Sequence, residues 1–170
     1  MRSLWIVLAF VTEYLVTFSV EASCPNLFVH HNASCYLFVN RGMSWQRAQQ
    51  HCHSLGAHLA TVTTSEENAF LVGYLKQQQA IFFGYDLWLG ASDSLLDKTW
   101  RWVADDNSLV TYSDWSPGQP DGSYQGLERC LEYEAQYDLH WNDDECEDHD
   151  FFICERPFNP PTPPLLPHVG

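Results

Sequence analysis

Five side chains toward the C-terminal end of the sequence offer oxygen atoms of the kind that bind a hard metal ion. They are Gln119, Asp121, Glu128, Asn142 and Asp143. Carboxylate and amide oxygens suit Ca²⁺, which takes about six to eight oxygen ligands, whereas zinc, copper and iron favour His or Cys. A divalent ion would also relieve the repulsion among the carboxylates. The alternative is that these are solvated loop residues, because Asn and Asp favour turns.

A long loop and several short strands must position these residues. The stretch from Tyr112 to Leu127 has no clear hydrophobic period and predicts a loop. Loops of this length within a compact domain are usually functional or disordered. Short aromatic runs bounded by Gly, Asp, Asn and Ser predict strands around it, and the best of them are residues 87–89, 100–103, 130–133 and 151–154.

The first half of the sequence predicts a hairpin and then a helix. Residues 27–29 and 35–39 are apolar runs separated by a polar turn. Ser44 is a good N-cap for a helix over residues 45–55, and Gly56 predicts its end. One face of this helix would carry Ala48, Cys52 and Leu55.

A second helix is predicted to open at Thr64. Thr64 and Glu67 have the spacing of a capping box. The residues that follow give this helix an apolar face, made of Phe70, Leu71, Tyr74 and Leu75. Helices followed by antiparallel-looking strands predict an α+β domain.

The net charge of −14 limits the partners of this chain. Nucleic acid needs a basic footprint, and anionic membrane surfaces are disfavoured for the same reason. A metal ion, a basic protein or a mineral surface would suit the charge. Acidic residues also follow the oxygen ligands, and we interpret them as a solvated face: Asp144, Glu145, Glu147, Asp148 and Asp150.

Both ends of the sequence differ in character from its middle. Residues 1–22 combine Arg2, an apolar run and a small-residue site at Ala22, which predicts a secretory signal peptide cleaved after Ala22. A retained membrane anchor is the alternative, although Glu13 would be costly in hydrocarbon. Residues 157–170 are rich in proline and predict an extended tail, which leaves residues 23–156 as the domain.

Secretion determines how the cysteines are interpreted. Six cysteines follow the predicted cleavage site, at positions 24, 35, 52, 130, 146 and 154. In an oxidising compartment they predict three disulfides, whose connectivity the spacing alone leaves open. A zinc site is the alternative, but the sequence has no C-x-x-C motif. Asn32-Ala33-Ser34 is an N-glycosylation acceptor in the predicted hairpin turn.

Several motifs together resemble the carbohydrate-recognition domain of C-type lectins. Leu87-Trp88-Leu89-Gly90 resembles the family's W-I-G-L strand, and Gln119-Pro120-Asp121 resembles its sugar-specificity tripeptide. Trp141-Asn142-Asp143 resembles its W-N-D motif. The resemblance extends from Cys24 to Glu155. It implies the pairs Cys24–Cys35, Cys52–Cys154 and Cys130–Cys146.

The resemblance also implies a role for the five oxygen donors. They would form one Ca²⁺ site, with the backbone carbonyl of Asp143 added, and the Gln119–Pro120 peptide would be cis. Two neighbouring sugar hydroxyls would complete the calcium shell while bonding to the same residues. The order Gln-Pro-Asp, rather than Glu-Pro-Asn, implies galactose-type sugars instead of mannose-type sugars. Ser123 stands where galactose binders often place Trp, and Tyr124 is the neighbouring aromatic residue.

An auxiliary calcium site of the family is predicted to be absent or weak. Asp93 and Asp97 match its beginning, but Gly122 and Arg129 stand where acids are expected, and Arg129 would repel a cation.

Tryptophan side chains are predicted to lie mainly in the core, at positions 88, 100, 102, 115 and 141. His140 lies next to the site and could make it sensitive to pH.

These features predict a secreted calcium-dependent lectin that binds galactose or N-acetylgalactosamine, rather than an enzyme. Its partners would be terminal glycans on cells or microbes, and noncovalent homo-oligomers would raise its avidity. A structural or mineral-associated calcium-binding protein of the same fold is the alternative. A glycosidase is disfavoured because carboxylates that bind a metal cannot also serve as proton donors.

Overall fold

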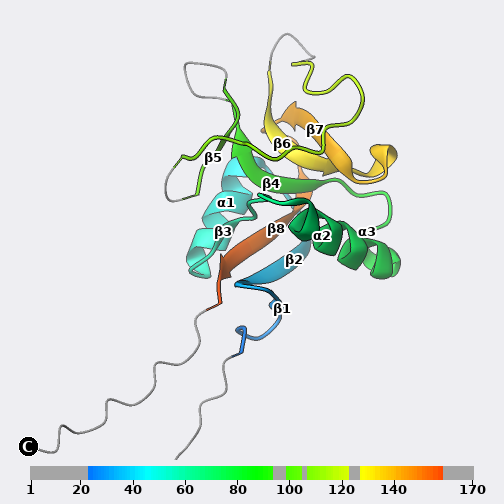
Figure 1. The fold of residues 1–170 in the computed structure, drawn as a ribbon. Coiled ribbons are helices and arrows are strands. Elements are labelled where there is room, and N and C mark those ends of the chain that lie inside the picture. The colour runs from blue at the N-terminus through cyan, green and yellow to red at the C-terminus, as the bar shows by residue number, and fades with distance from the viewer. Residues whose placement is uncertain (1–22, 94–98, 105–106, 123–126, 159–170) are drawn as a thin grey trace, which may run out of the picture.

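The computed structural model describes residues 23–93, 99–104, 107–122 and 127–158. In sequence order the elements are β1 (Val29–His31), β2 (Ser34–Met43), α1 (Trp45–Ser54), β3 (His58–Leu59), α2 (Ser65–Gln77), α3 (Gln79–Phe82), β4 (Leu87–Ser92), β5 (Arg101–Trp102), β6 (Glu128–Glu134), the 3₁₀ helix η1 (Ala135–Tyr137), β7 (His140–Glu145) and β8 (Asp150–Pro157). The described α-helices all precede β4, and the strands from β4 onward are interrupted by one short 3₁₀ helix (Figure 1). The α+β class predicted from the sequence is confirmed.

The described strands belong to one sheet, in which β4 and β8 form the centre. The order is β1-β2-β8-β4-β6-β7, with β3 paired to β8 and β5 paired to β4. Only the pairing of β4 with β8 is parallel among the described strands. Figure 1 shows β6 and β7 at the opposite end of the molecule from β1. The predicted ligands lie at this β6–β7 end.

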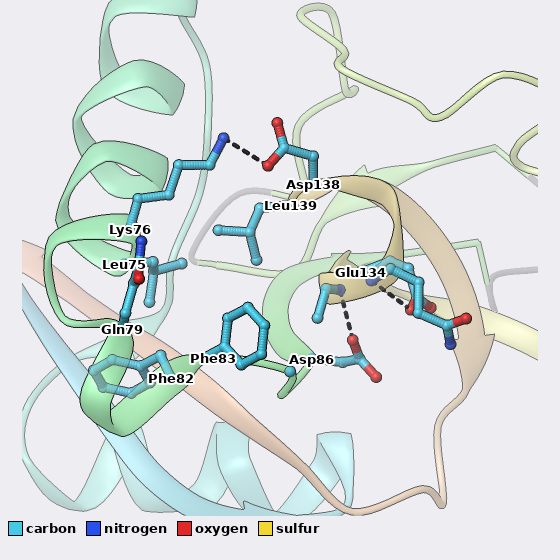
Figure 2. Close-up of a pocket in the computed structure, with 12 residues that line it drawn as sticks. Leu75, Lys76, Gln79, Phe82, Phe83, Asp86, Glu134, Asp138 and Leu139 are labelled. Atoms are coloured by element: carbon cyan, nitrogen blue, oxygen red, sulfur yellow. Dashed lines mark hydrogen bonds and ion pairs between the residues drawn. The ribbon is translucent and has the colours of Figure 1, made fainter.

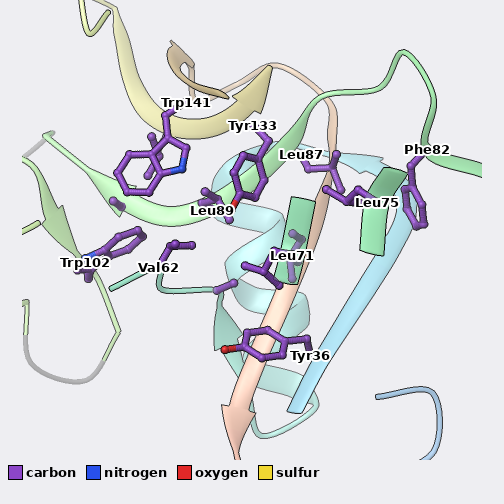
Figure 3. Close-up of a cluster of buried hydrophobic side chains, with 14 residues drawn as sticks. Tyr36, Val62, Leu71, Leu75, Phe82, Leu87, Leu89, Trp102, Tyr133 and Trp141 are labelled. Atoms are coloured by element: carbon purple, nitrogen blue, oxygen red, sulfur yellow. The ribbon is translucent and has the colours of Figure 1, made fainter. Parts of the chain in front are cut away.

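Helices α1 and α2 pack on opposite faces of the sheet. Phe152 of β8 and Trp88 of β4 are buried in one apolar cluster with Cys52 of α1. The next residue on β8, Ile153, is buried in a second cluster with Leu71 of α2. Figure 3 shows Leu71 within this cluster. Because successive strand side chains point to opposite faces, these alternating assignments place the two helices on opposite sides of β8.

The helix boundaries follow their predicted caps. Thr64 Oγ1 accepts a hydrogen bond from the backbone N–H of Glu67 at 3.2 Å. The Glu67 carboxylate reaches the N–H of Thr63 at 2.8 Å, instead of the N–H of Thr64 that an ideal capping box would use. Ser44 caps α1 without a side-chain hydrogen bond, and Gly56 after α1 has a φ of +65°, which glycine adopts easily.

Three disulfides brace the described chain. They join Cys24 to Cys35, Cys52 to Cys154 and Cys130 to Cys146, as the resemblance implied. No cysteine is free, so the zinc alternative is wrong. The Cys52–Cys154 bond closes the longest loop in sequence, and in the chain-entropy account long loops gain the most stability from a disulfide.

Some sequence predictions differ from the structure. Leu55 is 38% exposed, because it follows the last helical residue and is not part of the buried helix face. Strands β3 and β7 were not predicted, since β3 has two residues and β7 is mostly polar. The tail was predicted to begin at residue 157, but Pro157 is the last residue of β8. The N–H of Phe158 also donates to the Ala33 carbonyl at 2.7 Å.

The tryptophan prediction holds for three of the five residues. Trp88, Trp102 and Trp141 are at most 2% exposed, whereas Trp100 and Trp115 are only partly buried against the same core.

The predicted signal peptide and the tail beyond Phe158 lie outside the described residues. Within the described part of the chain, no helix combines the length and apolar character needed to cross a membrane.

Candidate functional site

The long loop is fixed against strand β7 at its base. The N–H of Ser116 donates to the carbonyl of Trp141 at 2.9 Å, and the N–H of Trp141 donates to the carbonyl of Asp114 at 2.9 Å. The rings of Trp115 and Trp141 meet edge to face, 5.7 Å apart. These contacts bring the start of the Gln119-Pro120-Asp121 tripeptide beside the Trp141-Asn142-Asp143 strand.

The Asp143 carboxylate holds the tip of the described loop in place. It accepts hydrogen bonds from the N–H of Asp121 at 3.1 Å and from the N–H of Gly122 at 2.9 Å. The preceding Gln119–Pro120 peptide is cis, as the resemblance implied. Asp143 is buried, although it lies next to a loop whose residue Asp121 is exposed. One side chain therefore joins the strand to the loop.

Three of the predicted ligands converge as a group, which we name the loop cluster: Asp121, Glu128 and Asp143. Each offers one carboxylate oxygen, and these oxygens lie within 4.8 Å of one another. Glu128 begins β6, two residues before the Cys130–Cys146 disulfide, and Asp143 lies on the adjacent strand β7. Three carboxylates at this spacing repel one another unless a cation or protons lie between them.

The two predicted amide ligands have oxygens that suit a cation. Gln119 Oε1 and Asn142 Oδ1 are both buried, and neither has a hydrogen-bond partner among the described residues. Burying an unpaired amide oxygen is costly, and a bound ion would remove that cost. The Nδ2 group of Asn142 donates to Glu132 Oε1 at 2.9 Å, which fixes the amide orientation. The donor set therefore fits a hard cation.

A surface pocket of about 390 Å³ borders the loop cluster. Trp100 and Pro120 contribute apolar surface to it, and Arg129 and Asp93 complete the wall beside the three carboxylates. Trp100 was predicted as a core residue, but it is only partly buried and lines this pocket. The sequence Trp100-Arg101-Trp102 does not indicate that Trp100 is the more exposed of the two tryptophans.

Several residues named from the sequence cannot be compared with the structure. Ser123 and Tyr124 of the loop and Asp97 of the auxiliary calcium site lie outside the described residues. His140 is described: its Nδ1 lies 3.1 Å from Asp114 Oδ2, and Asp114 also accepts from Asn68 Nδ2 at 2.8 Å. His140 therefore contacts the base of the long loop.

The acidic residues after Asp143 do not form the uniformly solvated face that was predicted. Glu147 and Asp148 are exposed, whereas Asp144, Glu145 and Asp150 are half-buried. Burial and neighbouring carboxylates raise the pKa of Asp144 to about 6 and that of Asp150 to about 7. Asp150 sits at the start of a central strand, so the sheet covers part of it.

Comparisons with known proteins agree with this geometry. A profile of the family described as "Lectin C-type domain" matches residues 41–156. Perlucin from Haliotis laevigata is 36% identical over 134 residues, which cover 78% of this chain and 83% of perlucin. Asialoglycoprotein receptor 2 from Homo sapiens is 32% identical over 142 residues, covering 81% of this chain. The chain spans 42% of the length of that receptor.

Solved structures show the same fold. The carbohydrate-recognition domain of the mouse scavenger receptor C-type lectin superposes with a TM-score of 0.71 and 27% identity, covering 81% of this chain and 100% of that one. Human lithostathine superposes with a TM-score of 0.68 and 26% identity, covering 79% and 99%. Since the family profile matches most of the described domain and the relatives exceed 30% identity, this chain belongs to the C-type lectin domain family.

Proposed function

We propose that this chain is a secreted, calcium-dependent lectin that binds galactose-type sugars. The loop cluster is the observation that supports this most strongly, because Asp121, Glu128 and Asp143 place carboxylate oxygens within 4.8 Å of one another. The unpartnered amide oxygens of Gln119 and Asn142 extend the donor set. Membership of the C-type lectin family supports carbohydrate as the ligand.

In this proposal the five side chains would hold Ca²⁺ at the loop. The ion would offer coordination positions to two neighbouring sugar hydroxyls. Gln119 and Asn142 can donate hydrogen bonds through their amide nitrogens, whereas Asp121 and Glu128 can only accept when ionised. Each sugar hydroxyl could then donate to a carboxylate and accept from an amide, provided that its geometry matches the order of the residues.

The order of the tripeptide supports a preference for galactose or N-acetylgalactosamine. Gln119 and Asp121 exchange the acid and amide positions of a Glu-Pro-Asn sequence, which reverses donor and acceptor across the ion. Trp100 borders the site pocket, and Tyr124 would be a further aromatic surface near the sugar. Aromatic rings can pack on an apolar sugar face.

The cysteine pattern supports an extracellular location. Three disulfides are typical of proteins that fold in an oxidising compartment, and the predicted signal peptide agrees with that. Asn32 lies exposed in the turn between β1 and β2, where a glycan could be attached. Because every cysteine is paired internally, assembly into higher-avidity oligomers would be noncovalent. Such oligomers would serve agglutination or innate immune recognition of microbes.

A binding assay on two sugar resins tests the proposal. Purified protein is loaded on galactose and mannose resins in Ca²⁺, washed, and eluted with EDTA. We expect retention on galactose resin, weaker retention on mannose resin, and release by EDTA. Glu147→Gln is the matched control, because Glu147 is exposed and lies outside the loop cluster. Retention that persists in EDTA would contradict the proposed site.

The acidic surface favours one second candidate, a structural or mineral-associated calcium-binding protein. The net charge of −14 and the exposed carboxylates of Glu147 and Asp148 would suit a calcium-rich surface. This candidate predicts calcium binding without retention on either resin, together with adsorption to calcium carbonate that Glu147→Gln combined with Asp148→Asn reduces.

A further inference from the structure

A second group of carboxylates meets in the middle of the sheet, and we name it the sheet cluster: Asp86, Glu132 and Asp150. Asp86 precedes β4 and Asp150 begins β8. The parallel pairing of β4 with β8 sets Leu87 opposite Phe151, and the N–H of Phe151 donates to the Asp86 carbonyl at 3.1 Å. The two aspartates are therefore neighbours across the parallel pair.

Glu132 reaches this position from the other side of β4. Strand β6 pairs with β4, and Glu132 lies directly opposite Trp88, two residues after Asp86. Asp86 lies one residue before the start of β4, so this pairing brings Glu132 close to it. The three carboxylates each offer an oxygen within 4.8 Å of the other two.

The carboxylate oxygens of this cluster are incompletely hydrogen-bonded. Glu132 is 1% exposed; its Oε1 accepts from Asn142 at 2.9 Å, but its Oε2 is buried with no partner among the described residues. Asp150 Oδ2 is also buried and has no hydrogen-bond partner among the described residues. A buried carboxylate oxygen without a donor is costly, so a cation that contacted these oxygens would be strongly favoured.

We propose that Asp86, Glu132 and Asp150 bind a hard divalent cation such as Ca²⁺, at a site separate from the loop cluster. The ligand atoms are all oxygen, which favours Ca²⁺ or Mg²⁺ over zinc or copper. Three carboxylates would more than balance a charge of +2. The proposal does not depend on sugar binding, because no residue of the loop cluster belongs to this site.

Burial explains why the cluster would gain from a cation. Burial is the largest cause that raises the pKa of each of the three carboxyl groups, and burial together with neighbouring acids raises that of Asp150 to about 7. Neighbouring acids add to the effect on Asp150, with Asp86 first among them. In the absence of a cation the cluster holds protons more tightly than ordinary carboxyl groups do.

Asp86 connects the cluster to a surface pocket, which neither Glu132 nor Asp150 lines. Asp86 lines a pocket of about 460 Å³ between α3 and η1, shown in Figure 2. Its Oδ1 accepts from the N–H of Ala135 at 2.7 Å, which holds the carboxylate at the pocket wall. Since Ca²⁺ takes about six to eight ligands, water from this pocket would complete the coordination that three side chains begin.

Calcium counting by equilibrium dialysis tests this site without reference to sugar. We expect Asp86→Asn with Asp150→Asn to bind one Ca²⁺ fewer per chain than the original protein, while retention on galactose resin persists. Asp143→Ala should also lose one ion, from the loop cluster, and the combined variant should lose two. Glu132→Gln is less selective, because Glu132 also bonds to Asn142 of the loop site.

Asp138→Asn is the matched control, because Asp138 lines the same pocket, pairs with Lys76 at 2.8 Å and lies outside the sheet cluster. It should leave the ion count unchanged. A crystal soaked in Ca²⁺ should show a peak about 2.3–2.6 Å from the three carboxylates. An unchanged count in the double asparagine variant, or a soaked crystal with no ion at the sheet cluster, would overturn the proposal. Circular dichroism should show that every variant is folded.

Discussion

The loop cluster and the sheet cluster contain the same kinds of side chain but are built in different ways. In the loop cluster a strand residue, Asp143, holds two backbone N–H groups of the loop and joins them to Glu128. In the sheet cluster Glu132 and Asp150 lie on strands that pair with β4, and Asp86 directly precedes β4. The first arrangement depends on a side-chain contact, and the second depends on sheet register.

This difference determines how each cluster should respond to change. Removing the Asp143 side chain from the loop cluster also removes the acceptor for two backbone N–H groups of the loop, so a proposed ligand and part of the scaffold are lost together. Removing one side chain from the sheet cluster leaves the strands in register. We therefore expect single substitutions to have larger effects on ion affinity at the loop cluster than at the sheet cluster.

The largest effect is expected from Asp143→Ala. This substitution removes a carboxylate ligand and also the acceptor for the N–H groups of Asp121 and Gly122. Calcium affinity at the loop should fall by about 100-fold or more, because ligand charge tunes the affinity of calcium sites over several orders of magnitude. Calcium-dependent retention on galactose resin measures this. If Asp143→Ala were retained as well as the Glu147→Gln control, the loop cluster would not be the site.

The next effect concerns the strand that supports the sheet cluster. A Cβ at Gly90 of β4 would lie 2.5 Å from the Leu59 carbonyl oxygen and 3.1 Å from that of Ala60. Both contacts are with backbone, so Gly90→Ala should lower the free energy of unfolding by about 1–3 kcal/mol. Thermal unfolding measures the loss, and calcium counting should show weaker binding at the sheet cluster than in the original protein.

Gly73→Ala is the matched control for Gly90→Ala. Gly73 lies inside α2, where a Cβ would meet nothing within 4 Å. Since alanine favours the helix over glycine by about 1 kcal/mol, this variant should be slightly more stable than the original protein. Equal destabilisation by both substitutions would show that the close approach of Gly90 to β3 is not the cause.

A smaller effect is expected when the tripeptide is changed. Gln119→Glu with Asp121→Asn exchanges the amide and the acid while it keeps the same number of oxygen donors. The ratio of mannose to galactose binding should rise by about tenfold, since reversed donors and acceptors leave polar groups of the disfavoured sugar unpaired. Competition by free sugars on the resin measures this ratio. An unchanged preference would mean that these two residues do not determine which sugar binds.

A pH dependence of stability is also expected, and it belongs to the sheet cluster. In EDTA the pKa of Asp150 is raised from 3.8 to about 7, first by burial and then by Asp86. The folded chain therefore holds a proton that the unfolded chain has lost between pH 3.8 and about 7, so stability falls as pH rises through this range. Asp150→Asn should flatten this slope in thermal unfolding at pH 5, 6 and 7. An identical slope in both proteins would contradict the burial of Asp150.

The parts of the site that are local in sequence could be predicted. The spacing of Thr64 and Glu67 predicted the start of a helix. The motifs Gln119-Pro120-Asp121 and Trp141-Asn142-Asp143 predicted two carboxylates of the loop cluster. The sheet cluster could not be predicted, because Asp86, Glu132 and Asp150 lie far apart in the chain and only the parallel pairing of β4 with β8 joins them. Strand β7 was missed for a different reason: it is mostly polar and gives no apolar alternation.

A crystal structure of the protein with Ca²⁺ and galactose would show whether the loop cluster binds both. We expect an ion about 2.3–2.6 Å from oxygens of Asp121, Glu128 and Asp143, with two neighbouring galactose hydroxyls on the same ion. Gln119 and Asn142 should then present their amide oxygens to the ion. A galactose bound elsewhere, or a loop cluster that stays without an ion in saturating Ca²⁺, would show that the loop cluster is not a calcium-dependent sugar site.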